Sequence, residues 1–516
     1  ALGLVNRGYD TVVRPTLELP LKDTACESCG QCVSTCPTGA LTAKLPFDKP
    51  GPWKDDRVVR TTCMRCGIGC IIDLHLSGGK ISRVTSPLRQ EVNDGNLCVK
   101  GAFEFEHVQG PNRLTRPLVK RGDALEKVSW EEAFNAAAAG LKEVISRFGP
   151  ESVAVLVSDN MSNEENFLAQ RLARQILKTP NIESTNPVFG GTVALNDVPP
   201  SYEEVALADF ILVVEADLPE DYLIVAQKVR KACKNGGKLG IIGGKATRLD
   251  GKAAYVAPVR TGDTPAVLAA FLDLIKGKKR EKAQAEAGKE TAAPQPAAGA
   301  VKAADLNGLA ELFLAAKSPV IILDGEKITA EELAIIQEAD SLSGRKGSGI
   351  LPLFKGGNTR GQLKLGISPY LLPAGIKARN RGLNLEQVAA AAGAGTVKAL
   401  LILGDGLKNE ARYLFSHVFT VVLTSTWRPD LNKSDVVFPG ATFYETRGTT
   451  TSCEGNMREI NPAFPPPGGK ENWEILKGLA NALGSPIHAD SPDEILEQMK
   501  RWLFVSSLGG FLSGQG

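Results

Sequence analysis

Four cysteines spaced for metal binding give this sequence its clearest chemistry. Cys63, Cys66, Cys70 and Cys98 follow the spacing C-x2-C-x3-C-x27-C. A cubane [4Fe–4S] cluster takes one thiolate on each of its irons, and three close cysteines with a distant fourth can supply them. Structural zinc is the main alternative, but it favours two C-x2-C pairs and this segment has one. Plain buried cysteines are the third reading. The spacing predicts that this segment binds a [4Fe–4S] cluster without ligands from elsewhere.

A second cysteine run lies nearer the N-terminus. Its members are Cys26, Cys29, Cys32 and Cys36, and Pro37 follows directly. The spacing C-x2-C-x2-C-x3-C-P is the pattern of bacterial two-cluster ferredoxins, in which three cysteines bind one cluster and the fourth binds the other. The companion run of such a pair is not in the sequence shown. We therefore expect Cys36 to serve a neighbouring cluster and a further run to lie upstream of Ala1. The alternative is that Cys36 closes the cluster of its own run.

The residues between these cysteines must bring the sulfurs together. Gly67 and Gly69 allow the tight backbone that lets three of them converge. The alternating run Ile71–Leu76 and the turn Ser77–Gly78–Gly79 are typical of a β-hairpin. Such a hairpin would bring the fourth ligand, Cys98, back to the first three.

Composition excludes several other classes of protein. The 516 residues predict about three or four domains, and 43% hydrophobic with 23% charged residues is ordinary for a globular chain. A net charge of +2 argues against a nucleic-acid partner, and no apolar run is long enough for a membrane span. Most of the 10 cysteines lie between Cys26 and Cys98. Such clustering indicates metal binding and predicts a reducing, cytoplasmic setting.

From about Val108 onward the sequence has the rhythm of an α/β fold. Short apolar runs at 152–158, 209–217, 238–244, 319–325, 398–404 and 419–425 alternate with helical periods. Near-continuous apolar strands of this kind are typical of parallel sheets covered on both faces. We expect an α/β fold class: a ferredoxin-like [4Fe–4S] module and a small β-rich [4Fe–4S] domain, then two doubly wound, mostly parallel α/β domains.

The expected domain boundaries follow from these patterns. Residues 1–50 would be the second half of the ferredoxin-like module, and 56–107 the [4Fe–4S] domain. Residues 108–150 with 318–480 would form one α/β domain, into which 151–275 is inserted as another. The Ala-, Lys-, Glu- and Pro-rich segment 276–304 predicts a flexible linker, because it has almost no large apolar residue to bury; its first third could form an exposed charged helix. Residues 481–516 would be a C-terminal helical tail.

Several segments together resemble one family. Residues 61–121, including GNLCVKGAFEFEHVQGPNRLTRPLVKR, with SNEENFLAQRLAR (162–174), GGNTRGQLKLG (356–366) and 434–476, resemble the molybdopterin oxidoreductases, above all the formate dehydrogenases. The large iron–sulfur subunit of complex I also places a ferredoxin module before this domain. Its relatives occur in soluble NAD(P)H-linked hydrogenases and electron-bifurcating transhydrogenases. By this resemblance Lys100 matches the lysine between cluster and pterin, which would bind the cofactor or tune the cluster.

The sequence departs from the formate dehydrogenases where their molybdenum cofactor binds. Aligned by the resemblance, Phe189 stands at the metal-binding Cys or selenocysteine and Gly190 at the following His. A Gly-Asn-Pro that approaches a pterin phosphate is replaced by Glu215–Leu218, and an Asp-Pro-Arg by Gly243–Lys245. The C-terminal domain that clasps the cofactor has no counterpart before Gly516. We therefore expect no molybdenum cofactor and name no catalytic residue.

The remaining reactive side chains are isolated in the sequence. His75, His107, His417 and His488 have no ligand partners nearby, and Cys233 and Cys453 stand alone. We interpret these histidines as packing or surface residues and the two cysteines as plain thiols. The turns Gly356–Asn358 and Gly404–Gly406 follow apolar strands, but neither matches a dinucleotide-binding fingerprint.

These observations predict an iron–sulfur electron-transfer subunit of a soluble NAD(P)H-linked complex of the bifurcating transhydrogenase or hydrogenase type. Its partners would be a flavin-containing NAD(P)H-binding subunit, a small iron–sulfur subunit and, as one acceptor, ferredoxin. Two alternatives stay open. One is a molybdenum or tungsten formate dehydrogenase, which metal analysis would reveal. The other is a non-redox scaffold, whose clusters would not be reduced by NADH or ferredoxin.

Overall fold

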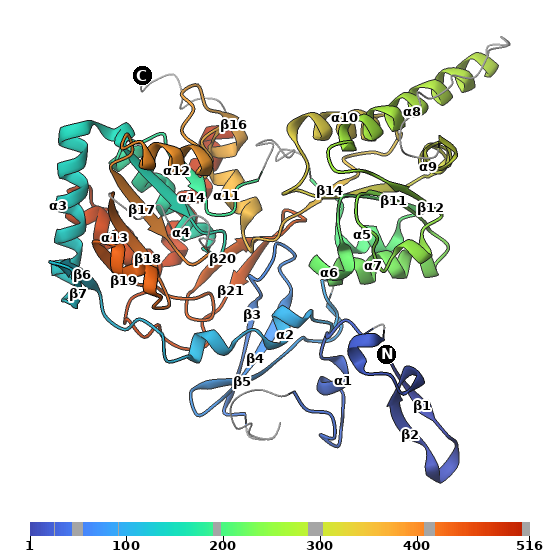
Figure 1. Ribbon diagram of the computed structural model, residues 1–516, viewed down its shortest axis with the longest axis horizontal. Coiled ribbons are helices and arrows are strands. Elements are labelled where there is room, and N and C mark those ends of the chain that lie inside the picture. The colour runs from blue at the N-terminus through green and yellow to red at the C-terminus, as the bar shows by residue number, and fades with distance from the viewer. Residues whose placement is uncertain are drawn as a thin grey trace.

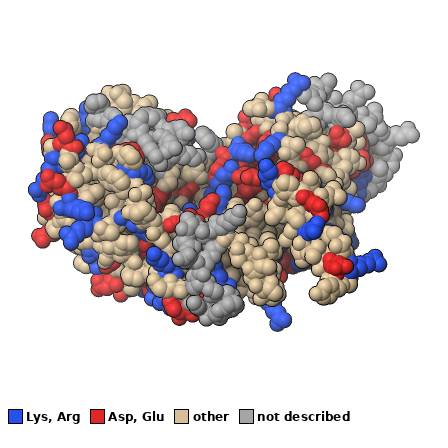
Figure 2. Space-filling model, turned by 60° about the horizontal axis from the view of Figure 1, so that its bottom comes forward, with Lys and Arg blue, Asp and Glu red and all other residues tan. Residues whose placement is uncertain are grey.

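The computed structural model describes residues 1–24, 26–43, 55–90, 92–188, 198–286, 303–406 and 418–507. Two α/β lobes stand side by side, and a small β-rich segment that carries the central cysteines lies below the gap between them (Figure 1). The N-terminal hairpin projects away from both lobes at the lower right. Side chains of Lys and Arg lie among those of Asp and Glu over the face shown in Figure 2, as the near-zero net charge predicts.

The N-terminal part of the chain forms two small β structures. Its elements are β1 (Leu2–Val5), β2 (Val12–Pro15), α1 (Gln31–Ser34), β3 (Arg57–Thr62), β4 (Ile71–Ser77), β5 (Lys80–Thr85) and α2 (Val99–Phe103). The predicted hairpin is confirmed: β4 pairs with β5, and Gly78 and Gly79 make the turn at φ +57° and +74°. Alternate side chains of β4 are buried, so one face of this sheet packs on the protein and the other faces outward.

The lobe on the left of Figure 1 is built on a seven-stranded sheet of order β7-β6-β19-β18-β17-β8-β9. Its strands are β6 (Leu118–Arg121), β7 (Ala124–Lys127), β8 (Val153–Val157), β9 (Ile182–Ser184), β17 (Ala399–Leu403), β18 (Phe419–Thr424) and β19 (Val436–Pro439). The five strands from β19 to β9 in this order are parallel, and β6 and β7 add an antiparallel edge. Ignoring that edge, the strand order is the doubly wound 2-1-3-4-5.

Helices cover both faces of this sheet. They are α3 (Trp130–Phe148), α4 (Asn163–Arg171) with the π turn η7 (Leu172–Ile176), α11 (Thr359–Leu365), α12 (Leu385–Gly393), α13 (Asn472–Ala482) and α14 (Pro492–Ser507). Val153, Val155 and Val157 of β8 belong to the core beneath α3, α4 and α13. Ala154 and Leu156 belong to the opposite core, with Val388 of α12. A strand buried on both faces has to be apolar at every position, which is the pattern seen in the sequence.

The lobe on the right of Figure 1 contains a five-stranded parallel sheet of order β12-β11-β10-β13-β14. Its strands are β10 (Phe210–Val214), β11 (Lys238–Gly243), β12 (Tyr255–Pro258), β13 (Pro319–Asp324) and β14 (Ile350–Leu353). Its helices are α5 (Tyr202–Leu207), α6 (Leu218–Asp221), α7 (Leu223–Lys234), α8 (Thr264–Glu286), α9 (Ala303–Ala315) and α10 (Ala330–Ser341). In chain order the strands read 3-2-1-4-5, the order of a dinucleotide-binding fold. Its core is continuous with that of the central cysteine segment.

Short elements complete the described chain. The strands are β15 (Leu371–Leu372), β16 (Ile376–Lys377), β20 (Gly448–Thr451) and β21 (Met457–Ile460), and the 3-10 turns are η1 (Gly8–Asp10), η2 (Thr16–Glu18), η3 (Leu21–Asp23), η5 (Glu106–Gln109), η6 (Pro150–Ser152), η8 (Asp250–Lys252), η9 (Pro373–Gly375) and η11 (Pro429–Lys433). Ser162 at the start of α4 and Thr329 at the start of α10 each form a capping box with both reciprocal hydrogen bonds. Across the described ranges no helix is long and apolar enough to cross a bilayer.

The α/β fold class is confirmed, but the strands are divided between the sheets differently from the prediction. The run at 152–158 was expected in the inserted domain, yet β8 lies between β17 and β9 in the seven-stranded sheet. The run at 319–325 was expected in the enclosing domain, yet β13 pairs with β10 in the five-stranded sheet. Both strands are apolar on both faces and fit either sheet by composition. The path of the connections between strands determines which sheet each strand joins, and the sequence does not specify that path.

The predicted linker is also corrected at both ends. Helix α8 continues to Glu286, so the first third of 276–304 is helical, the alternative that its charge pattern allowed. Helix α9 begins at Ala303. The remaining part, 287–302, lies outside the described residues. In the expected C-terminal tail, α14 is a helix that packs on α4.

Candidate iron–sulfur centres

The structure brings the four central cysteines together at one end of the small sheet. The Cys63 N–H donates to the Cys70 carbonyl at 2.8 Å, which closes the loop between β3 and β4. Cys98 caps α2, and its Sγ accepts from the Gly101 N–H at 3.5 Å. A Cβ on Gly101 would lie 3.8 Å from Cys63 Sγ and 3.9 Å from Cys98 Sγ. A glycine there leaves room between the first and last cysteines of the set.

The electrostatics of this site fit a metal cluster better than four free thiols. Burial, with a smaller effect from the charge of Cys98, raises the pKa of Cys63 to about 12. Burial also raises the pKa of Cys66 and of Cys70, and the neighbouring cysteines add to both shifts. Without metal these thiols would stay protonated at neutral pH, whereas iron supplies the positive charge that stabilises thiolates.

The donor set of this site is four cysteines, Cys63, Cys66, Cys70 and Cys98. A [4Fe–4S] cluster takes one thiolate on each of four separate irons, so its ligands need not meet at one point. The electrostatic effects of these cysteines on one another show that they lie close together. The residues therefore fit such a cluster. When bound, it would accept and donate single electrons, and the protein would hold it, bury it and set its potential.

The loop that carries these cysteines is fixed to both neighbouring parts of the molecule. The Gly67 N–H donates to the Phe354 carbonyl at 3.0 Å, and the Gly67 carbonyl accepts from the Cys453 N–H at 2.6 Å. A Cβ on Gly67 would lie only 2.6 Å from Cys453 Sγ. Cys453 is fully buried. It was interpreted from the sequence as a plain thiol, and its position against the cluster loop was not foreseen.

A second group of polar residues packs beside Cys63. Arg65 contacts His107 Nδ1 at 3.0 Å, and the His107 ring meets Tyr444 edge-on at 6.3 Å. Partial desolvation, together with the charge of Arg65, lowers the pKa of His107 to about 4. The side chain of His107 is nevertheless exposed, so it lies at the surface beside the site, within the predicted class of packing or surface residues. Arg113 forms two 2.7 Å bonds to the buried Glu445 nearby.

Other isolated side chains have ordinary surroundings. His75 contacts Asp55 at 2.7 Å and Thr85 at 2.8 Å within the small sheet. Cys233 is half-buried on α7, and His417 lies outside the described residues. Lys100 is half-buried in α2, two residues beyond Cys98. Its place beside the cluster site agrees with the resemblance, and its role stays a prediction.

The N-terminal cysteine run packs directly against the central segment. A Cβ on Gly30, between Cys29 and Cys32, would lie 2.9 Å from the Phe103 ring. The Gln31 side chain donates to the Gly95 carbonyl and, at 3.1 Å, to Asn96 Oδ1. Phe103 and Asn96 flank Cys98, so the two cysteine sites are in van der Waals contact through these residues.

The same run is also anchored to the five-stranded lobe. Both carboxylate oxygens of Glu27 accept from Arg230 of α7. Arg248 donates to the Cys26 carbonyl at 3.2 Å. These contacts fix the first half of the run. The fourth cysteine, Cys36, lies apart from them at the exposed end.

The four N-terminal cysteines are all half-buried. The Cys36 thiol contacts Thr38 Oγ1 at 3.6 Å. Hydrogen bonding to the Leu41 backbone and to Thr38 lowers its pKa to about 7. The groups that lower the pKa of Cys36 are not cysteines. In the central site, by contrast, neighbouring cysteines raise one another's pKa. The ligand assignment in this run stays a prediction.

The carboxyl edge of the five-stranded sheet does not suit an anionic cofactor. In this strand order a ligand phosphate would approach between β10 and β13. The edge instead carries the carboxylates of Glu215, Asp217, Asp221, Asp324 and Glu326, which we call the acidic edge. Glu215 has φ +52°, and its Oε1 accepts from Thr264 at 2.9 Å. Carboxylates in this place repel a phosphate.

Lysines of the same lobe neutralise the acidic edge from within. Lys245 contacts Asp217 at 2.9 Å, and Lys355 contacts Asp221 at 3.2 Å. Lys327 lies 3.5 Å from Asp324 and donates to the Glu215 carbonyl at 2.8 Å. The charges that would bind a phosphate are thus already paired with the protein's own carboxylates. Phe189 and Gly190, the other expected departures, lie outside the described residues.

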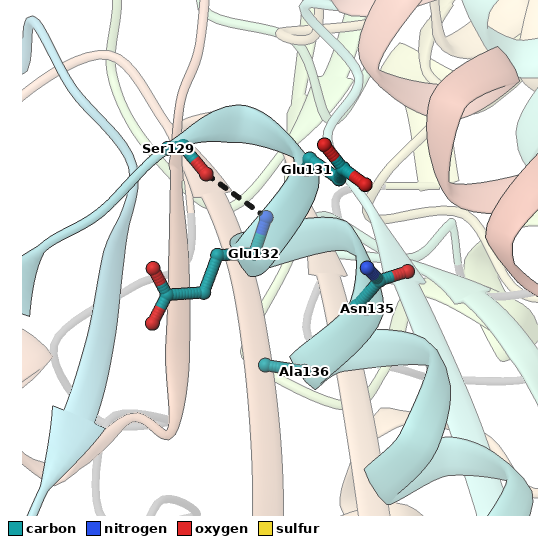
Figure 3. A pocket seen from close by; sticks show the side chains of 5 residues that line it. All are labelled: Ser129, Glu131, Glu132, Asn135 and Ala136. Atoms are coloured by element: carbon teal, nitrogen blue, oxygen red, sulfur yellow. Dashed lines mark hydrogen bonds between the residues drawn. The ribbon is translucent and has the colours of Figure 1, made fainter.

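Two surface hollows lie away from the cysteines. One, of about 440 Å³, is lined by Ser129, Glu131, Glu132, Asn135 and Ala136 at the start of α3 (Figure 3). There the Glu132 N–H donates to Ser129 Oγ at 3.2 Å, an ordinary helix cap. Another, of about 390 Å³, lies between Phe148 and Val397. The Ser129 hydroxyl is accounted for by this helix cap, and the linings of the two hollows point to no substrate class.

Comparison with family models separates the two cysteine segments from the α/β part of the chain. Residues 113–482 match the model described as molybdopterin oxidoreductase. The chain belongs to the molybdopterin oxidoreductase family. Residues 56–110 match its Fe4S4 domain, and 22–42 match a 4Fe-4S binding domain. Both cysteine runs of this molybdopterin oxidoreductase family member therefore lie in [4Fe–4S] binding domains.

Individual relatives agree with this assignment. The chain is 29% identical over 570 aligned positions to the NADPH-Fe(3+) oxidoreductase subunit alpha of Geobacter sulfurreducens, covering 100% of this chain and 66% of that protein. It is 25% identical to the F420-dependent formate dehydrogenase subunit alpha of Methanocaldococcus jannaschii, over 83% of this chain and 70% of that protein. The acetylene hydratase from Pelobacter acetylenicus shares the fold, with a TM-score of 0.60 and 16% identity over 85% of this chain and 70% of that one.

The match to these proteins is partial in length. This chain spans between 50% and 66% of the length of the first four curated relatives. What those whole proteins do therefore does not transfer directly to this molybdopterin oxidoreductase family member.

Proposed function

We propose that this chain is the iron–sulfur electron-transfer subunit of an NAD(P)H-linked oxidoreductase complex. A central [4Fe–4S] cluster would be bound by Cys63, Cys66, Cys70 and Cys98. An N-terminal cluster would take Cys26, Cys29 and Cys32, with Cys36 serving a neighbouring cluster. The chain itself would convert no substrate.

One observation carries this proposal: the two cysteine sites touch. Gly30 meets the Phe103 ring, and Gln31 bonds to Gly95 and Asn96. Electron transfer between clusters weakens steeply with distance, so direct packing of the two sites favours transfer from one to the other. A scaffold that only needed metal for stability would have no reason to place its sites in contact.

The name of the Geobacter relative supports an NADPH-linked role. Electrons from NAD(P)H arrive as a hydride and must be split into single electrons before a [4Fe–4S] cluster can take them. A flavin performs that step, so we propose a flavin-containing NAD(P)H-binding subunit as the donor partner. A small iron–sulfur subunit and ferredoxin would complete the path, and the reducing cytoplasm would be its place.

We further propose that the chain holds no molybdenum or tungsten cofactor. The acidic edge supports this, because its carboxylates occupy the side of the sheet where a phosphate would approach and its lysines are already paired. The sequence difference at Phe189 points the same way, since a phenylalanine cannot bind a metal.

Metal and redox analysis of the purified complex tests these proposals. We expect iron and acid-labile sulfide for at least two clusters, molybdenum and tungsten far below one atom per chain, and cluster reduction by NADPH or NADH through the partner subunit. Clusters that stay oxidised with both nucleotides and with reduced ferredoxin would favour the scaffold.

A second candidate is a molybdenum or tungsten formate dehydrogenase. Its support is the family match over 113–482 and the Methanocaldococcus relative. Near-stoichiometric molybdenum or tungsten together with formate oxidation would establish this function and contradict the proposed one.

A further inference from the structure

Arg458 places a positive charge against the loop that holds the central cysteines. It lies on β21 and pairs across the ladder with Thr450 of β20. A Cβ on Gly69 would lie 3.2 Å from Arg458 Cδ and 3.4 Å from its Nε. Gly69 directly precedes Cys70 and has φ +67°. Its lack of a side chain lets the guanidinium pack on the backbone of the loop.

A ring of hydrogen bonds holds the guanidinium in that position. Arg458 Nη2 donates to Glu454 Oε2 at 2.7 Å. Glu454 Oε1 accepts from the Tyr202 N–H at 2.7 Å, and the Tyr202 hydroxyl donates to the Ile68 carbonyl at 3.0 Å. Ile68 precedes Gly69, so the ring starts and ends on the cysteine loop. Only 17% of the Arg458 side chain and 7% of the Glu454 side chain are exposed.

Part of the guanidinium has no partner within the described ranges. Arg458 Nε is buried and makes no hydrogen bond to the residues the structure describes. A buried N–H of this kind normally has an acceptor. The sulfur atoms of a cluster are such acceptors, and hydrogen bonds to them raise its potential. Arg458 Cδ and Nε lie against Gly69, which directly precedes the proposed ligand Cys70, so the guanidinium is held beside the cluster site.

We propose that Arg458 raises the reduction potential of the central cluster and that Glu454 is the residue that positions it. The inference rests on the proposed ligand set. Reduction adds one electron from a one-electron donor and transfers no atom, so the cluster becomes more negative by one charge. A fixed positive charge at a site shielded from water stabilises the reduced form more than the oxidised form. Glu454 opposes this effect with its own charge while it holds the guanidinium in place.

Redox titration of the full chain, followed by EPR of the central cluster, tests the proposal. In Arg458→Gln we expect the ratio of reduced to oxidised cluster at a fixed potential to fall about tenfold, which is about 59 mV for one electron. Arg458→Lys keeps the charge and should recover most of the shift. Glu454→Gln removes the opposing charge but keeps an acceptor, so its potential should move upward.

Arg60→Gln is the matched control. Arg60 lies on β3 of the same domain and pairs with Asp73 at 2.8 and 3.1 Å, but its side chain is 64% exposed. Water and salt screen such a charge, so we expect no shift. The N-terminal cluster should also keep its potential in every variant.

The outcomes separate this inference from the proposal beneath it. An Arg458→Gln protein with full iron content and an unchanged potential would overturn the inference. If Arg458→Gln loses its cluster, the potentials of Arg458→Lys and Glu454→Gln test the inference instead. An unchanged potential in Glu454→Gln would then contradict the inference. If Cys98→Ser leaves the central signal intact, the ligand set itself is wrong and the proposed function fails with it.

Discussion

The two cysteine sites differ in how much of their surroundings this chain supplies. Around the central site the chain provides four converging cysteines, a buried loop fixed by Phe354 and Cys453, and a guanidinium held in place. The N-terminal site is anchored on one side by Glu27 and Gln31, while Cys36 and the hairpin β1–β2 extend away from the body. Leu4, Tyr9, Val13 and Leu17 of this part are exposed. With the proposed ligand sets, the central site would be completed by this chain alone, whereas the N-terminal site would share a ligand with a neighbouring cluster.

The largest expected difference between the two sites is in the loss of a ligand. Cys98→Ser should abolish the central EPR signal, lower the iron content by about one cluster and destabilise the domain, because the cluster contributes folding free energy. Cys36→Ser should leave the central signal unchanged. Cys233→Ser is the control for loss of a thiol outside both sites. A central signal that survives Cys98→Ser but disappears in Cys36→Ser would reverse the comparison.

Thiol reactivity of the metal-free protein should separate the sites almost as clearly. The thiolate is the reactive form, and the pKa is lowered to about 7 at Cys36 but raised to about 12 at Cys63. Alkylation of Cys36 by iodoacetamide should therefore rise with pH and reach half its maximal rate near pH 7. Cys63 should stay almost unmodified through pH 9. Peptide mass spectrometry after timed quenching measures both alkylation rates. Equal rates for Cys36 and Cys63 at pH 7 would show that the two sites do not differ in thiol reactivity.

Replacing one glycine of each site by alanine should have a smaller effect, which is a loss of stability. In Gly67→Ala the new Cβ would lie 2.6 Å from Cys453 Sγ and 3.2 Å from the Phe354 carbonyl oxygen. Overpacking of this kind costs about 1–3 kcal/mol of unfolding free energy. Cys453→Ala in the same chain should restore part of it, because the two changes share one contact. Denaturant unfolding measures this.

Gly30→Ala is the corresponding change at the N-terminal site. Its Cβ would meet the Phe103 ring at 2.9 Å, so we expect a displaced N-terminal run and an unchanged central core. Gly251→Ala is the control, since its Cβ would have no atom within 4 Å. If Gly30→Ala lowered the stability of the central site as much as Gly67→Ala, the two sites would be one unit.

The smallest expected effect concerns the ion pair that anchors the N-terminal run. Glu27→Gln should weaken the contact with Arg230 by about 1 kcal/mol. The run should then open more often, and limited proteolysis near residues 37–43 should speed up several-fold. Glu143→Gln, which breaks the exposed pair with Arg147, should leave the cleavage rate unchanged. Equal rates in all three proteins would show that Glu27 does not hold the run.

Local features of this fold could be predicted from the sequence because they depend on neighbouring residues. The hairpin after Cys70 and the apolar strands were both predicted correctly. The sheet that each strand joins was not, since β8 and β13 are equally apolar and their partners lie far along the chain. The sequence also left two alternatives for the first third of the 276–304 segment, a flexible linker or an exposed charged helix. Helix α8 shows that this part is helical.

The same limit applies to the candidate site. The cysteine spacing predicted which residues would converge, and the structure brings the central four together. Arg458, Glu454 and Cys453 could not be foreseen, because they reach the cluster loop from the opposite end of the chain. No spacing rule connects residues so far apart in sequence, and an arginine on a short strand ordinarily predicts a solvated side chain.

The proposed function requires two [4Fe–4S] centres in direct contact, so that an electron passes between them. The most direct test is low-temperature EPR of the fully reduced chain. Two reduced clusters whose sites are in contact through Gly30 and Phe103 should couple magnetically, giving broadened signals that become sharp in Cys98→Ser. A spectrum of the intact protein that equals the sum of two independent, unbroadened clusters would contradict the claim.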